Sequence, residues 1–340
     1  MPREAILSVA DLAVAFDTHE GEVRAVRGVS FTLGKGEVLA IVGESGSGKS
    51  VTVQAIMGLT AIPPGKIVSG EVVFEGTDLL AAPDDVLRRI RGNRMSMIFQ
   101  DPMSSLNPSM TVGAQIGEVL RQHRKLSRAE TRRRAVELMR LVGIPDPENR
   151  FGQYPHQFSG GMRQRIMIAI AMANNPDVLL ADEPTTALDV TIQSQIFRLI
   201  RDLRERFGTS MMLITHDLGL VAGSADRILV MYAGRIVEEG LTDQIFENPQ
   251  HPYTAGLLGA VPSLEDSDDR PLRTVEGLPP VLLNIPEGCA FADRCPHRML
   301  ICRQEAPPDF RPLADNRAAC WLHHEAAAGP RTAFLARQAA

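Results

Sequence analysis

The stretch that decides the fold is Gly43-Glu44-Ser45-Gly46-Ser47-Gly48-Lys49-Ser50, which reads G-x-x-x-x-G-K-S. The apolar run Val38–Val42 precedes it, and Lys49–Leu59 has helical character. Glycines in a strand–loop–helix context let backbone N–H groups turn inward around phosphates, and the helix N-terminus adds partial positive charge. The stretch therefore predicts a phosphate-binding loop, in which Lys49 reaches the β- and γ-phosphates and Ser50 binds Mg²⁺.

Segments of strand character alternate with helical segments on both sides of this loop. The two unbroken apolar runs Val178–Ala181 and Met211–Thr215 suit parallel strands that are buried on both faces. Residues from about 111 to 142 are expected to be helical, with Ser127 and Glu130 in a capping box. Four further strands are expected at Ala5–Phe16, Arg24–Phe31, Glu37–Val42 and Gly70–Phe74. This alternation predicts a doubly wound α/β sheet with a helical insertion.

Composition narrows the class of protein. The 340 residues carry a net charge of −5, with 44% hydrophobic and 23% charged residues, as in ordinary globular proteins. This charge gives no basic signature for nucleic acid, so no nucleic-acid partner is expected. The N-terminus does not resemble a signal peptide, and the apolar runs are far shorter than the ~20 residues of a spanning helix. A role at a membrane would therefore require docking onto partner subunits.

Two adjacent carboxylates end one of the buried strands. Asp182 and Glu183 follow the run Val178–Ala181 directly. Burying a charge at a strand end is costly unless the charge is paired or lies near a metal. Asp182 therefore suits Mg²⁺, and Glu183 suits a general base that orients water. His216 directly follows the run Met211–Thr215. Open α/β sheets bind ligands at the carboxyl ends of their strands, so His216 is expected to form a hydrogen bond with the γ-phosphate.

A further motif, Phe158-Ser159-Gly160-Gly161-Met162-Arg163-Gln164-Arg165, resembles the signature of ATP-binding-cassette ATPases. The usual motif reads Leu-Ser-Gly-Gly-Gln, so Phe158 and Met162 are departures that leave the serine and both glycines in place. Other segments are similar to family motifs in the same order: the Q-loop at Gln100, the D-loop at Ala187-Leu188-Asp189, the switch histidine at His216 and the adenine-stacking aromatic at Phe16.

The resemblance implies a fold and a mechanism. The fold is an α/β P-loop NTPase cassette over residues 1–240, with an N-terminal antiparallel β subdomain and a helical subdomain at about 100–170. Two cassettes would sandwich two ATP molecules, and hydrolysis would drive membrane subunits. The implied contacts fall into four groups: catalysis by Glu183, His216 and Gln100; ATP binding by Phe16, Gly43, Glu44, Ser45, Gly46, Ser47, Gly48, Lys49, Ser50 and Val51; Mg²⁺ at Ser50, Gln100 and Asp182; and ATP of the partner at Ser159, Gly160, Gly161 and Asp189.

Residues 241–340 form an expected accessory segment, tethered through residues 264–271. Asn248-Pro249-Gln250-His251-Pro252-Tyr253-Thr254 resembles the His-Pro-Tyr element of oligopeptide and dipeptide importer ATPases. The resemblance implies a peptide importer at the cytoplasmic face of the membrane, with a second cassette (a heterodimer), two permease subunits and, indirectly, a substrate-binding protein. Import of nickel or another small solute is the alternative. A soluble ATPase acting on ribosomes or DNA, and an inactive cassette, are less favoured, because the chain has one cassette with intact motifs.

Four cysteines, Cys289, Cys295, Cys302 and Cys320, are spaced C-x5-C-x6-C-x17-C. Structural zinc sites have tighter pairs, whereas four thiolates in an irregular segment suit a [4Fe–4S] cluster, as in some members of the importer subfamily. Zinc, disulfides and free thiols remain alternatives. The four cysteines all lie in one segment, which is not the pattern of a secreted disulfide-bonded protein and favours the reducing cytosol as the compartment. The run Arg132–Arg134 is interpreted as a solvated helix face.

Overall fold

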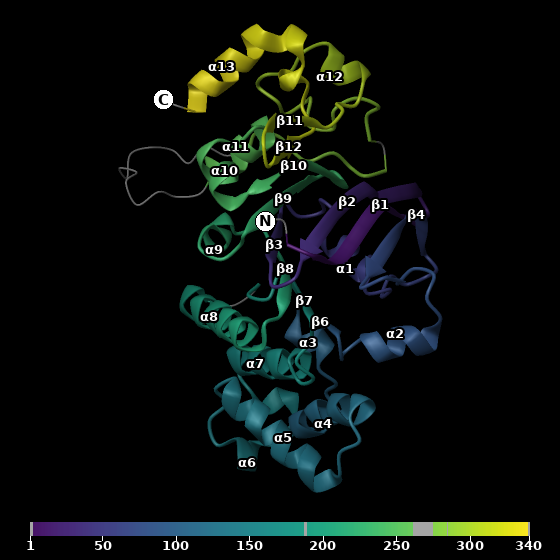
Figure 1. The fold of residues 1–340 in the computed structure, drawn as a ribbon, viewed down its shortest axis with the longest axis vertical. Coiled ribbons are helices and arrows are strands. Elements are labelled where there is room, and N and C mark those ends of the chain that lie inside the picture. Colours follow the sequence, from purple (N-terminus) through teal and green to yellow (C-terminus); the bar gives the residue numbers. More distant parts are fainter. Residues whose placement is uncertain (1–2, 187–188, 261–274, 284, 339–340) are drawn as a thin grey trace. The chain divides into compact units, whose positions relative to one another are not determined.

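The computed structural model describes residues 3–186, 189–260, 275–283 and 285–338. Figure 1 shows the elements of the chain coloured by sequence position. Residue contacts divide the chain into two compact units, each built from several stretches of sequence. The first comprises residues up to 6, 33–37 and 81–214, and the second comprises residues 7–32, 38–80 and those from 215 onward. The division expected at residue 240 stays a prediction, and the second unit contains residues on both sides of it. The expected tether at 264–271 lies outside the described residues.

A parallel sheet lies at the centre of the first unit, in the order β8-β7-β6. Its strands are β6 (Met95–Ile98), β7 (Val178–Asp182) and β8 (Ser210–Thr215), and every residue in them is buried. Side chains on both faces are covered, which explains why the sequence shows unbroken apolar runs instead of alternation. Ile98 pairs with Ala181, and Asp182 with Ile214, so the carboxyl ends of the three strands lie side by side.

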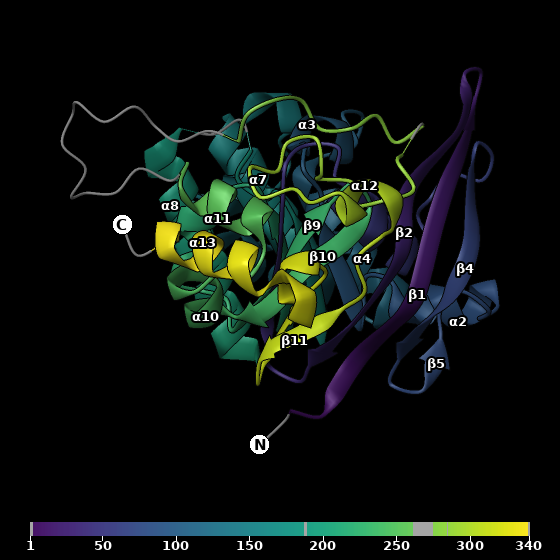
Figure 2. The same ribbon diagram turned by 90° about the horizontal axis from the view of Figure 1, so that it is seen from above.

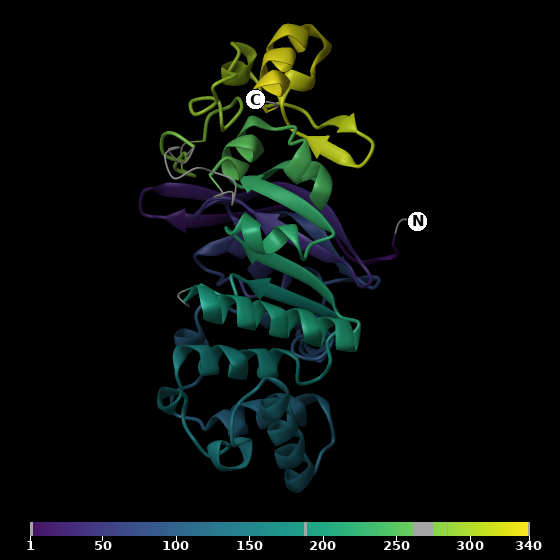
Figure 3. The ribbon, with the colours of Figure 1, turned by 90° about the vertical axis from the view of Figure 1, so that its left-hand side faces the viewer.

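Helices make up most of the rest of the first unit. The expected helical region 111–142 is interrupted at residues 124–127, and the capping box of Ser127 and Glu130 starts its second helix as predicted. Figure 3 shows α7 and α8 side by side, in agreement with the contacts between them. The helices are α2 (Asp84–Ile90), α3 (Pro102–Ser105), α4 (Val112–His123), α5 (Arg128–Leu141), α6 (Pro147–Arg150), the 3₁₀ helix η1 (Pro155–Gln157), α7 (Gly160–Ala171) and α8 (Val190–Phe207).

The second unit contains an antiparallel sheet in the order β2-β1-β4-β5. Figure 2 shows its long strands β1, β2 and β4 side by side. The strands are β1 (Ala5–Thr18), β2 (Gly21–Gly34), β4 (Gly65–Phe74) and β5 (Thr77–Asp78), and they are longer than the sequence predicted. β4 begins at Gly65, five residues before the expected start at Gly70, and Gly65 pairs with Phe16 of β1.

A second set of strands in this unit has the order β11-β12-β10-β9-β3. β3 (Val38–Val42) is parallel to β9 (Arg227–Tyr232), and β10 (Arg235–Leu241) is antiparallel to β9. β11 (Phe310–Leu313) and β12 (Asn316–Ala318) come from the accessory segment, and β12 pairs with β10. The accessory segment therefore extends a sheet that begins with the strand before the phosphate-binding loop.

The helices of the second unit are short, apart from the last. Cys320, Leu322 and Phe334 form a small core under the last helix, with Met299 packed against it. Among the helices described, none has the length and apolar character needed to cross a membrane. They are α1 (Lys49–Ile56), α9 (Leu218–Ala222), α10 (Thr242–Glu247), α11 (Pro252–Leu258), α12 (Ile301–Gln304), the 3₁₀ helices η2 (Trp321–His323) and η3 (Glu325–Ala327), and α13 (Ala328–Gln338).

Candidate functional site: a phosphate-binding loop and an acidic strand end

The loop between β3 and α1 has a backbone that only glycine permits at two positions. Gly43 has φ 154° and Gly48 has φ 100°. A Cβ on Gly43 would lie 2.2 Å from the carbonyl oxygen of Met231, and one on Gly48 would lie 2.3 Å from that of Ala25. Both approaches are to backbone atoms, so a side chain could not be accommodated by rotamer changes. Gly43 and Gly48 are thus required by close packing as well as by backbone conformation.

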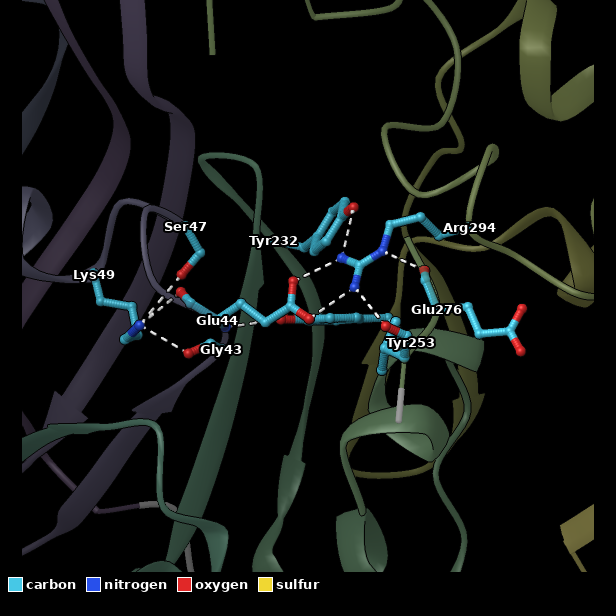
Figure 4. Close-up of polar contacts among 9 residues, drawn as sticks. Gly43, Glu44, Ser47, Lys49, Tyr232, Tyr253, Glu276 and Arg294 are labelled. Atoms are coloured by element: carbon cyan, nitrogen blue, oxygen red, sulfur yellow. Dashed lines mark hydrogen bonds and ion pairs between the residues drawn. The ribbon is translucent and has the colours of Figure 1, made fainter. Parts of the chain in front are cut away.

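Lys49, the first residue of α1, folds back over this loop. Its side chain is 4% exposed, and its Nζ donates to the carbonyl oxygens of Gly43 at 2.8 Å and Glu44 at 2.9 Å (Figure 4). Ser50 and Val51 continue the first turn of α1, whose N-cap is Gly48. The ammonium group is therefore held at the loop, where it can attract an anionic ligand.

Phe16 lies near the end of β1 and is half-buried. It pairs with Gly65, and a Cβ on that glycine would lie 3.1 Å from the Phe16 ring. The absence of a side chain at position 65 leaves room beside the ring. Its role as the adenine contact stays a prediction.

The carboxylates after β7 are anchored in the first unit. Asp182 is the last residue of β7 and is 2% exposed. Glu183 follows with φ 43°, and its backbone N–H donates to the carbonyl oxygen of Ile214 at 2.9 Å. Its Oε2 accepts hydrogen bonds from Gln100 Nε2 at 3.0 Å and from Thr186 Oγ1 at 2.9 Å. Three of the predicted residues, Gln100, Asp182 and Glu183, are thus assembled at one edge of the parallel sheet.

The remaining predicted catalytic residue, His216, follows β8 directly, as the sequence predicted. It belongs to the second unit, together with Lys49 and Ser50. The catalytic roles of His216 and Glu183, and the Mg²⁺ site, stay predictions.

The signature motif begins a helix. Ser159 is the N-cap of α7, and its Oγ accepts from the Met162 N–H at 3.4 Å. Ser159 and Gly160 are exposed, and a Cβ on Gly161 would lie 3.1 Å from a methyl group of Ile192. The exposed start of a helix is suited to binding an anion.

The D-loop is described only at its end. Asp189 is exposed and is the N-cap of α8, where its carboxylate accepts from the Ile192 N–H at 2.9 Å. Ala187 and Leu188 lie outside the described residues. The contacts of Ser159, Gly160, Gly161 and Asp189 with a partner's ATP stay predictions.

The His-Pro-Tyr element has a structural role that the sequence did not indicate. His251 is the N-cap of α11 and accepts from the Tyr253 N–H at 3.0 Å. The Tyr253 hydroxyl accepts from the backbone N–H of Glu44 at 2.9 Å. Burial raises the pKa of Tyr253, which keeps this hydroxyl neutral. Arg294, which no motif singled out, binds the Glu44 carboxylate. The accessory segment therefore reaches the phosphate-binding loop.

The four cysteines form no disulfide in this structure. Burial is the main cause that raises the pKa of Cys289 to about 11 and of Cys295 to about 12, and it also raises that of Cys320. Cys289, Cys295 and Cys302 each raise the pKa of Cys320 further, as neighbouring thiolates do. In the described parts of the chain, no group of three or more His, Cys, Asp or Glu side chains is arranged to hold a metal ion.

The fold and the site are those of a P-loop ATPase. Comparison with known proteins identifies the family of P-loop ATPases to which the chain is similar. Residues 26–186 match the model of the ABC transporter family, and residues 237–302 match that of the oligopeptide/dipeptide transporter C-terminal region. The oligopeptide transport ATP-binding protein OppD of Bacillus subtilis is 56% identical over 319 residues, covering 94% of this chain and 89% of the relative. The dipeptide transport ATP-binding protein DppD of the same organism is 53% identical, covering 95% of this chain and 96% of the relative.

Solved structures agree. The dimeric ATP-binding cassette MJ0796 bound to ADP and Pi has a TM-score of 0.62 at 29% identity, covering 69% of this chain and 98% of that one. The chain belongs to the ABC transporter ATP-binding proteins, in the oligopeptide/dipeptide transporter subfamily, and is an ATPase. The sequence-based assignments of family, fold class and enzyme class are thereby confirmed.

Proposed function

We propose that this chain is the ATP-hydrolysing subunit of a membrane importer for dipeptides or oligopeptides. The observation that carries the proposal is the C-terminal region, residues 237–302, which matches the oligopeptide/dipeptide transporter model in addition to the cassette itself. The relatives OppD and DppD are named for oligopeptide and dipeptide transport and extend over nearly the whole chain. Uptake of nickel or another small solute is the alternative, and radiolabelled uptake assays in a deletion strain distinguish the two.

The nucleotide would be held by the loop from Gly43 to Val51, with Phe16 against adenine. Ser50, Asp182 and Gln100 would hold Mg²⁺, and their hydroxyl, carboxylate and amide oxygens are the hard donors that this ion prefers. Mg²⁺ would neutralise charge on the β- and γ-phosphates. Asp182, which is 2% exposed at the end of β7, would supply a carboxylate oxygen to the ion.

Glu183 would act as the general base for the attacking water. Gln100 and Thr186 both donate to its Oε2, which fixes the orientation of the carboxylate that would take the proton. His216 would donate a hydrogen bond to the γ-phosphate as charge moves onto it. Hydrolysis would then depend on positioning and electrostatics, as in other phosphoryl transfers.

A second cassette would complete each nucleotide site. Ser159, Gly160 and Asp189 are exposed at helix starts, where they are accessible to an ATP bound by a partner. MJ0796 is described as a dimer in its ADP-bound and Pi-bound state, which supports the same arrangement here. The partner would be a different cassette, and two permease subunits would bind the pair at the cytoplasmic face of the membrane, with a substrate-binding protein acting indirectly. Recovery with two integral membrane subunits and a second cassette supports this assembly, whereas recovery with ribosomes contradicts it.

Replacing the general base tests the catalytic assignment. Glu183→Gln should abolish steady-state hydrolysis and retain ATP binding, because the amide cannot take the proton. Glu205→Gln, an exposed carboxylate on α8, is the control and should leave turnover unchanged. Wild-type turnover in Glu183→Gln would remove Glu183 from its role.

The cysteines would hold a [4Fe–4S] cluster. Around one zinc ion, tetrahedral thiolates would lie about 3.8 Å apart, given a Zn–S bond of about 2.3 Å, and zinc stays the alternative. A four-iron cluster needs four thiolates spaced more widely, and three of these cysteines act electrostatically on Cys320. Backbone N–H groups also donate toward the sulfurs of Cys289, Cys295 and Cys320, which stabilises thiolate ligands. Such a cluster would stabilise a segment with little core. Anaerobic purification with iron and sulfide assays tests it, and a colourless protein with stoichiometric zinc contradicts it.

A further inference from the structure

Arg294, from the cysteine-containing segment, forms a bidentate ion pair with Glu44 of the phosphate-binding loop. Nη1 lies 2.6 Å from Oε2 of Glu44, and Nη2 lies 2.9 Å from Oε1 (Figure 4). The Arg294 side chain is 6% exposed and that of Glu44 is 26% exposed. Two parallel charge-assisted hydrogen bonds with little solvent around the arginine are a strong and directional contact.

The guanidinium group of Arg294 also donates hydrogen bonds to three acceptors other than Glu44. Nε donates to the carbonyl oxygen of Glu276 at 2.9 Å, Nη2 to that of Val275 at 3.0 Å, and Nη1 to the Tyr232 hydroxyl at 3.3 Å. Together with the two bonds to Glu44, these contacts use all five N–H donors of a guanidinium group. Arg294 is therefore held independently of Glu44, and it can impose a position on the glutamate.

An aromatic cluster supports the same region. The ring of Phe291 lies 5.3 Å from that of Tyr232 and 5.4 Å from that of Tyr253. Tyr253 accepts the backbone N–H of Glu44, so the accessory segment holds both the backbone and the side chain of this residue. Arg294 lies between Cys289 and Cys295 in sequence, and its N–H donates to the Phe291 carbonyl oxygen at 3.1 Å. Arg294 therefore links the cysteine-containing segment to the phosphate-binding loop through hydrogen bonds at both ends.

The charge of Glu44 explains why the loop requires this contact. Glu44 follows Gly43, and its own carbonyl oxygen accepts from Lys49 Nζ at 2.9 Å. A free carboxylate at this position would repel a triphosphate and compete for the lysine ammonium group. The guanidinium group of Arg294 neutralises the carboxylate and keeps it turned toward the accessory segment, as Figure 4 shows.

We propose that Arg294 is a positioning residue for the phosphate-binding loop: it neutralises and orients Glu44, so that the C-terminal segment sets the affinity of the loop for ATP. The proposal rests on the assignment of residues 43–51 as the nucleotide site. It gives the accessory segment a direct part in nucleotide binding, in addition to any metal it carries.

A double-mutant cycle on the full-length chain tests the pair. The dissociation constant of a fluorescent ATP analogue with Mg²⁺ is measured for the wild type, Arg294→Met, Glu44→Gln and the double variant. Arg294→Met should weaken binding about tenfold, the order expected when a charge-assisted bond loses one partner. Adding Glu44→Gln to Arg294→Met should restore most of the lost affinity, because no unpaired carboxylate remains, and the single Glu44→Gln variant completes the cycle.

Controls separate this effect from misfolding. Arg303→Met removes another arginine of the same segment, whose ion pair with Asp293 is exposed at 60% and 82%, and binding should not change. If Arg294→Met does not fold, Arg294→Lys replaces it; this variant keeps the charge without the bidentate geometry and should give an intermediate loss. Wild-type affinity in Arg294→Met, or a double variant as weak as Arg294→Met, overturns the proposal. Unchanged binding in Lys49→Ala would instead overturn the nucleotide site itself.

Discussion

Gln100 and Glu183 are joined by a hydrogen bond of 3.0 Å, although they lie 83 residues apart in sequence. The parallel pairing of β6 with β7 places the two strand ends side by side, so the residue two positions after Ile98 meets the one two positions after Ala181. Thr186 donates to the same carboxylate oxygen. The general base is thus held by one residue from its own loop and one from the neighbouring strand end.

Removing the Thr186 hydroxyl tests this arrangement. Thr186→Val should lower kcat about tenfold and leave ATP affinity unchanged, because a hydrogen bond to a charged group contributes about 1.5–3 kcal/mol and part of it is retained through Gln100. Thr186→Ser is the matched control and should keep most of the activity. Steady-state phosphate release measures kcat, and a valine variant with normal kcat would show that Gln100 alone orients the base.

The sequence predicted the phosphate-binding loop and the acidic strand end because both are local. Each is a short motif that directly follows an apolar strand, so spacing along the chain determines its position. The signature motif is local as well, and the structure places its Ser159 at the N-cap of α7.

The contacts of Glu44 could not be predicted in this way. Tyr253 lies 209 residues and Arg294 lies 250 residues further along the chain, and no periodicity reports such a pair. The sequence predicted an accessory segment at residues 241–340 but not that its strand β12 pairs with β10 and extends the sheet. Hydrogen bonds between distant strands depend on tertiary packing, which composition does not reveal.

Gln164 connects the signature helix to the loop after Glu183. It is 2% exposed, and its Nε2 donates to the carbonyl oxygen of Pro184 at 2.6 Å. Gln164→Leu should lower the free energy of unfolding by about 1–3 kcal/mol, because the buried carbonyl group loses its donor. Gln122→Leu, at an exposed position of α4, should change it by no more than about 0.5 kcal/mol. Urea unfolding measures both, and equal stability of the two variants would contradict a structural role for Gln164.

Burial of His251 predicts a dependence of stability on pH. Burial, and then the charge of His323, lower the pKa of His251 to about 3, whereas an unfolded histidine titrates near 6.5. Between these values the unfolded chain binds a proton that the native chain does not, so stability rises with pH and is lost as pH falls below about 6.5. Two neighbouring groups also titrate: burial lowers the pKa of His323 and raises that of Glu238, whose contribution has the opposite sign.

His251→Asn isolates the contribution of His251 from those of Glu238 and His323. Asparagine can still accept the Tyr253 N–H as an N-cap, so the start of α11 is preserved. A single titrating group contributes at most about 1.4 kcal/mol per pH unit, so from pH 6.5 to 5.5 the wild type should lose about 1 kcal/mol more stability than the variant. Urea unfolding at several pH values measures this difference. Parallel loss in both proteins would mean that native His251 takes up a proton as readily as the unfolded residue does, which its 1% exposure opposes.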